Sequence, residues 1–155
     1  MTAYAATTMS DYHDIYVLLY GYAERIDAGD FDGVAGLFEH ATITFEGYDQ
    51  VRRGGQEVLA MYTASTRRYP DDGTPKTKHV ITNVVVEIED GGDAAHSRSY
   101  YTVLQAVPGA LALQPVIAGR YHDRFERVDG RWRFAARHML VDLVGDLSEH
   151  MLFDL

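Results

Sequence analysis

Apolar residues recur at helical spacing in the first third of the chain. They predict a helix from about Ser10 to Asp27, in which Ser10 or Asp11 caps the start and Gly29 ends the last turn. The face expected to be buried consists of Ile15, Leu18, Leu19, Tyr22 and Ile26. Asp27 is therefore expected at the end of an amphipathic helix.

Two shorter helices and one strand are expected next. Asp30 can cap a helix over residues 31–38, and apolar residues at helical spacing predict a third helix over residues 55–67. Between these helices, the sequence ATITFEG at residues 41–47 alternates as a strand does. The sequence YPDDGTP at residues 69–75 has the composition of a loop.

The second half of the chain is rich in β-branched and aromatic residues, which favour strands. Strands are predicted at residues 79–89, 94–107, 116–127 and 131–142. Residues 111–115 break the strand pattern, whereas Asp129-Gly130 favours a tight type I′ hairpin turn. The tail from Gly145 contains both polar and apolar residues, and we expect it to fold over a pocket or a neighbouring subunit.

Helices followed by an antiparallel meander predict an α+β fold. We expect a cone-shaped, curved antiparallel or mixed β-sheet with three N-terminal helices that enclose a pocket. The length of 155 residues fits a single domain spanning residues 1–155. A cone that is open at one end is a natural site for a small molecule.

Composition narrows the classes of function. The chain has 14 basic and 23 acidic residues, and a net charge of −9 argues against a nucleic-acid partner. No apolar run is long enough to span a membrane, and the N-terminal sequence lacks the pattern of a signal peptide. The absence of cysteine excludes disulfides and thiolate chemistry and fits a reducing compartment, so we expect a cytoplasmic protein.

Three motifs, in their order along the chain, resemble a known family. IDAGDFD at the helix end, KHVITN at a strand start and FERVDGRWRF at the last hairpin are similar to the SnoaL-like family of the nuclear-transport-factor-two-like superfamily. The resemblance covers nearly the whole chain. Scytalone dehydratase, polyketide cyclases and lindane dehydrochlorinase belong to this superfamily, and small subunits of ring-hydroxylating dioxygenases share the fold without catalysing the reaction.

The resemblance implies roles for individual residues. Asp27 matches a helix-end aspartate and His79 a strand-start histidine of the dehydrochlorinase and dehydratase members. Tyr121 matches a position that lines the pocket, and Arg137 matches a pocket arginine. The dehydratase pattern also contains a second histidine, and His96 is the candidate for that position in this chain.

Asp27 and His79 together would form a general base. A neutral imidazole takes up a proton near pH 7, and a carboxylate on its other ring nitrogen fixes the tautomer and stabilises the imidazolium. The alternative is that Asp27 caps the next helix and that His79 is a core histidine with its hydrogen bonds satisfied.

Three further side chains are candidates for contact with a substrate. Tyr22 shares the buried helix face and could direct its hydroxyl into the pocket, although such a tyrosine usually packs in the core. Asn83 lies four residues after His79, hence on the same strand face, and could bind a substrate oxygen or satisfy a backbone group. Arg137 could anchor a substrate or pair with Asp123 across the hairpin.

These features predict a cofactor-independent enzyme of the lyase, isomerase or cyclase type that acts on a small apolar metabolite, polyketide-, terpenoid- or aromatic-like. The alternative is a non-catalytic subunit that binds a ligand or supports a partner. No motif requires a cofactor, and His122 and Asp123 point to opposite strand faces, so no metal site is expected. A curved sheet leaves an outer face to be covered, and a homodimer or homotrimer is therefore expected.

Overall fold

The computed structural model describes residues 8–154. Within this range the chain forms three helices and six strands. The helices are α1 (Met9–Asp27), α2 (Phe31–Leu37) and α3 (Gly54–Ser65). The strands are β1 (Thr42–Phe45), β2 (Tyr48–Arg53), β3 (Thr77–Ile88), β4 (Ala94–Val107), β5 (Leu111–Val128) and β6 (Arg131–Val144).

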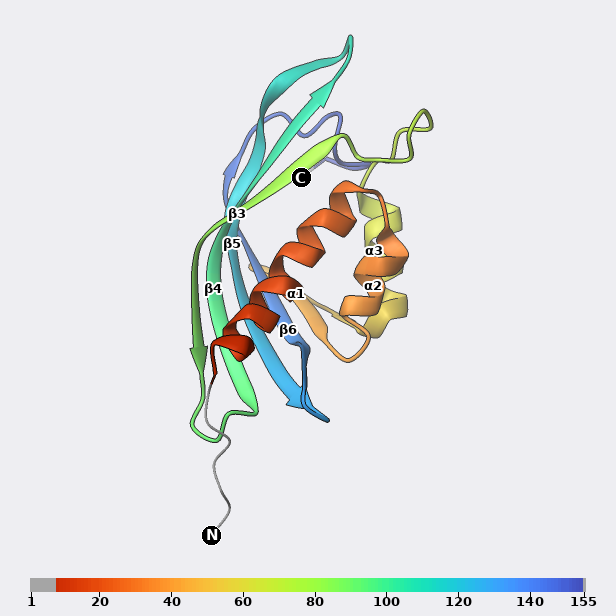
Figure 1. Cartoon of the computed structure of the whole chain (residues 1–155). Helices are drawn as coiled ribbons and strands as arrows, with labels where there is room; N and C mark the ends of the chain where they lie inside the picture. Colours follow the sequence, from red (N-terminus) through yellow and green to blue (C-terminus); the bar gives the residue numbers. More distant parts are fainter. Residues whose placement is uncertain (1–7, 155) are drawn as a thin grey trace.

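The strands form one curved sheet, and the helices cover its concave face (Figure 1). The strand order is β2-β1-β6-β5-β4-β3, and every neighbouring pair is antiparallel except β1 and β6. The expected α+β cone with a mixed sheet is therefore confirmed. No helix in the described range is long and apolar enough to cross a membrane.

The core lies between α1 and the concave face of the sheet. Ile15, Leu19 and Ile26 of α1 are fully buried, as their spacing predicts. Phe38 stacks on Phe134 of β6 with ring centroids 4.6 Å apart, which joins the end of α2 to the same core. This packing fixes the direction of α1 and thereby the position of its last residue, Asp27.

Capping residues in the sequence determine where most of the helices begin and end. Gly29 has a left-handed φ of 73°, which ends α1, and the Asp30 side chain accepts a hydrogen bond from the backbone N–H of Gly33 to cap α2. At the start of α1 the prediction was wrong, because Thr8 is the cap. Thr8 and Asp11 form a reciprocal capping box, in which Asp11 occupies the third helical position.

The sheet differs from the prediction in two places. β5 begins at Leu111, so residues 111–115 do not break the strand, because Pro115 lies beside a register shift where a missing N–H is tolerated. β2 was not predicted, since it is a polar edge strand without a buried face. Asp129 and Gly130 both have positive φ angles, 51° and 78°, as the expected type I′ turn requires.

Candidate active site

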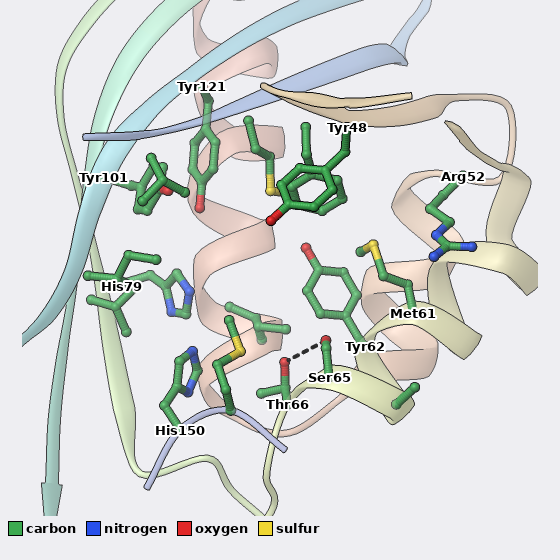
Figure 2. A pocket seen from close by; sticks show the side chains of 18 of the residues that line it. Tyr48, Arg52, Met61, Tyr62, Ser65, Thr66, His79, Tyr101, Tyr121 and His150 are labelled. Atoms are coloured by element: carbon green, nitrogen blue, oxygen red, sulfur yellow. Dashed lines mark hydrogen bonds between the residues drawn. The ribbon is translucent and has the colours of Figure 1, made fainter. Parts of the chain in front are cut away.

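A pocket of about 580 Å³ opens between α1, α3 and the concave face of the sheet. Its volume lies in the range of sites for small organic molecules. Figure 2 shows that aromatic side chains from the sheet and from α3 face its interior, with two histidines at one end. Its lining is mostly apolar, and its polar side chains include those of Tyr22, Tyr62, His79 and His150.

Asp27 and His79 are in direct contact at the wall of this pocket. Oδ1 of Asp27 lies 2.6 Å from Nδ1 of His79, and both side chains are less than a tenth exposed. The hydroxyl of Thr77 and the backbone N–H of His79 also donate to the same carboxylate, each at 2.8 Å. Asp27 therefore holds the first residues of β3 and does not cap α2, whose cap is Asp30.

The state of the carboxylate determines the tautomer of the histidine. Burial has the largest influence and would raise the pKa of Asp27. The hydrogen bonds and charge of His79, together with the hydroxyl of Thr77, outweigh burial and lower this pKa below its usual value. The ionised carboxylate can only accept hydrogen bonds, so Nδ1 of His79 carries the proton. In the neutral imidazole, Nε2 is then the proton acceptor, and the ring faces the pocket.

Two tyrosine hydroxyls meet opposite the histidine. The hydroxyl oxygens of Tyr22 and Tyr62 lie 2.9 Å apart, and both residues line the pocket. Burial, followed by the neighbouring Tyr22, holds the pKa of Tyr62 well above its usual value, so this phenol keeps its proton. The pair can satisfy one hydroxyl internally and offer the other proton to a bound molecule.

Tyr121 lines the pocket, as the family resemblance implies. Its ring stacks on that of Tyr101 with centroids 4.4 Å apart, and its hydroxyl points toward the interior (Figure 2). The close approach of Tyr101 is possible because Gly119 has no side chain, whose first carbon would stand 2.7 Å from the Tyr101 hydroxyl.

Arg137 lies behind this aromatic wall and does not line the pocket. Its guanidinium is fully buried and makes two hydrogen bonds, 2.7 and 2.8 Å long, to the carboxylate of Asp123. Its central carbon lies 3.9 Å from the ring centre of Tyr121 and 4.4 Å from that of Tyr22. Of the two alternatives, the pair with Asp123 is therefore present, and the guanidinium has no surface open to the pocket.

Asn83 and His96 lie outside the pocket. The expectation that Asn83 shares the strand face of His79 is wrong, because the pairing of β3 shifts between Thr82 and Val85 and Asn83 takes a positive φ of 53°. Its side chain is exposed. His96 is about half exposed and contacts Glu87 on the outer surface, so it is not the second histidine of the site.

His150 is the pocket histidine that the sequence did not reveal. It comes from the tail after Gly145, which we expected to fold over a pocket or a neighbouring subunit, and its ring lies beside that of His79 (Figure 2). Burial, with a smaller contribution from His79, lowers the pKa of His150 to about 4. A lone histidine in an irregular tail has no local signal of its place in the fold.

Between residues 8 and 154, no three histidine, aspartate or glutamate side chains gather in a way that could hold an ion. Asp123 is buried in its pair with Arg137, whereas His122 is exposed, so the two neighbours point to opposite faces.

The curved sheet, the helix layer and the pocket form an α+β cone, the fold of the nuclear-transport-factor-two-like proteins. Within it, the chain belongs to the SnoaL-like family, because the model of the SnoaL-like domain matches residues 7–138. Among proteins with curated functions, none matches this chain.

Solved structures show the same fold. An aspartate-to-asparagine variant of a Mycobacterium tuberculosis protein of unknown function is 27% identical, with a TM-score of 0.71 over 88% of this chain and 79% of that one. A protein assigned as a scytalone dehydratase from Novosphingobium aromaticivorans is 18% identical, with a TM-score of 0.70 over 89% and 88%. LinA is 20% identical, with a TM-score of 0.69 over 90% and 91%.

Proposed function

We propose that this protein is a cofactor-independent enzyme of the lyase, isomerase or cyclase type, with Asp27 and His79 as its general base. One observation supports this proposal above the others. A histidine whose Nδ1 is held by an ionised aspartate directs its remaining basic nitrogen into an apolar pocket of suitable size.

The proposed reaction begins with the removal of a proton from carbon. Nε2 of His79 takes the proton, and the carboxylate of Asp27 stabilises the imidazolium that forms. The electrons of the broken C–H bond move toward an adjacent carbonyl, whose oxygen gains negative charge. A free hydroxyl proton of the Tyr22–Tyr62 pair can stabilise that oxygen. Loss of a leaving group, or return of the proton to another carbon, completes an elimination or an isomerisation.

The substrate is proposed to be small and mostly apolar. Tyr101, Tyr121, Val103 and Ile117 of the sheet form much of the pocket wall and suit an aromatic, polyketide-like or terpenoid-like skeleton. The assignment of one solved relative as a scytalone dehydratase agrees with this class of chemistry. A non-catalytic, ligand-binding role is the alternative, and the open space beside His79 favours catalysis over it.

A comparison of variants over a panel of substrates tests the proposal. Small hydroxyketones, lactones, epoxides and organic halides are offered to the native protein, to His79→Ala and to His13→Ala, in which an exposed histidine of α1 is removed as a control. Positioned proton transfer contributes about 10²- to 10⁴-fold in rate, so His79→Ala should lose activity by that order while the control keeps it. Equal rates for His79→Ala and the native protein on every substrate turned over would refute the general-base role.

A further inference from the structure

The pocket contains a second imidazole that the proposed base does not use. His150 is 5% exposed, its ring lies beside that of His79 at one end of the pocket (Figure 2), and its Nδ1 is buried without a hydrogen-bond partner among the described residues. A buried histidine with a purely structural role is expected to have its ring nitrogens paired. Nδ1 has no open surface, so the nitrogen that a ligand in the pocket can reach is Nε2, which also makes no hydrogen bond among the described residues.

The backbone on both sides of His150 is held in place. The backbone carbonyl of Glu149 accepts hydrogen bonds from the side chains of Tyr69 and Gln105, at 2.7 and 2.9 Å. The carbonyl of His150 accepts from the backbone N–H of Arg67, and the N–H of Leu152 donates to the carbonyl of Ser65, both at 2.9 Å. The backbone that carries the imidazole is therefore held in place before any ligand enters, as the support of a catalytic group must be.

The surroundings of His150 keep it uncharged. Burial is the main cause that lowers its pKa to about 4, and a charge on His79 acts in the same direction, whereas the carboxylate of Asp27 opposes both. Near pH 7 the ring is neutral and carries one N–H. A neutral imidazole is a poor source of protons, but it is a good hydrogen-bond donor to a developing oxyanion.

We propose that His150 is a further catalytic residue, which donates a hydrogen bond from its neutral imidazole to the substrate oxygen that gains negative charge. This proposal rests on the proposed function of His79. The proton leaves carbon for Nε2 of His79, the C–H electrons form the new double bond, and the carbonyl π electrons move to oxygen. The N–H of His150 remains on nitrogen throughout and stabilises that oxygen beside the base.

The test uses 4-nitrophenolate, an aromatic oxyanion, as a probe that needs no knowledge of the substrate. His150→Phe keeps a ring in place without the donor, and His150→Gln keeps a donor of similar reach. Charge-assisted hydrogen bonds are about twice as strong as neutral ones, so His150→Phe should bind the probe about tenfold or more weakly. His150→Gln should recover part of the loss, and the surface control His13→Phe should bind as the native protein does.

A second measurement needs no variant. With ¹⁵N-labelled histidine, the ring signals of His150 in the native protein should move when 4-nitrophenolate binds. Unchanged affinity in His150→Phe, unmoved His150 signals, or failure of the native protein to bind the probe would each overturn the proposal. His79→Ala should still bind the probe and lose turnover, so a failure of the general base is distinguished from a failure of His150.

Discussion

At the scale of single residues, the buried pair of Arg137 and Asp123 supports the aromatic wall of the pocket. Both side chains are fully buried, and the guanidinium lies against Tyr22 and Tyr121. Asp123→Ala would leave a buried charge without its partner, which costs about 3–5 kcal/mol of unfolding free energy. Urea unfolding measures this loss.

The same hairpin offers a matched control for that experiment. Arg120 and Asp142 also form a pair with two hydrogen bonds of 2.8 Å, but on the exposed face of the sheet. Water and salt screen this pair, so Asp142→Ala should change the unfolding free energy little. Equal losses for the two variants would contradict the role assigned to the buried pair.

His150 links the stability of the fold to pH. Its pKa is 6.5 in the unfolded chain and about 4 in the folded one, so the unfolded chain binds more protons between these values. The contribution of His150 to stability is therefore fully present above pH 6.5 and is lost progressively as the pH falls toward 4.

This dependence of stability on pH predicts a measurable difference in unfolding free energy between the native protein and a His150 variant. Between pH 7.5 and pH 5, the unfolding free energy of His150→Phe should fall by about 2 kcal/mol less than that of the native protein. Denaturant titrations of both proteins at the two pH values provide the comparison. Parallel losses in the two proteins would show that His150 is protonated equally in the folded and unfolded chains.

At the scale of elements, the contact between the tail and the loop after α3 closes one end of the pocket. The hydroxyl of Tyr69 is hydrogen-bonded to both the carbonyl and the carboxylate of Glu149, and burial together with that carboxylate raises the pKa of Tyr69 to about 12. Tyr69→Phe removes these bonds without changing the ring. The tail should then open more often.

Amide hydrogen exchange reports that opening directly. The N–H groups of Arg67 and Leu152, which bond across the contact, should exchange faster in Tyr69→Phe than in the native protein. Tyr20→Phe, on the exposed side of α1, serves as the control and should leave both rates unchanged. If Tyr69→Phe also leaves them unchanged, the hydroxyl does not hold the tail.

Some positions of the site could be predicted from the sequence of their helix or strand, and others could not. Asp27 and His79 stand at a helix end and near a strand start, and both positions carry local signals. Asn83 was misplaced because the alternation of a strand fails at a bulge, and no residue pattern marks the bulge in advance. His150 is held at the pocket by hydrogen bonds between the tail and segments that are distant in the sequence. A pattern of neighbouring residues does not indicate such contacts.

At the scale of the whole molecule, the convex face of the sheet exposes apolar side chains. The strand pairing places Val80, Thr102, Ala118 and Leu143 in one row across β3, β4, β5 and β6. Val80 is 41% exposed and Leu143 is 70% exposed. We expect this face to be covered by a second or third copy of the chain, because contiguous apolar surface tends to mark an interface.

Sedimentation velocity tests the expected homodimer or homotrimer. The native protein should sediment as more than one chain, and Leu143→Asp should shift it toward the monomer by placing a charge in the apolar row. Asp154→Asn, in the exposed end of the tail, is the control and should sediment as the native protein does. A native protein that is monomeric at high concentration would contradict the expectation.

The central claim is that Asp27 and His79 act as one catalytic unit in an apolar pocket. It is tested most directly by the catalytic rates of four proteins on one substrate: native, Asp27→Asn, His79→Ala and the double variant. Each single variant should lose about 10²- to 10⁴-fold in kcat while its unfolding curve stays cooperative, and the double variant should be little slower than the worse single one. Losses that multiply in the double variant, or a His79→Ala protein with native activity, would contradict the account.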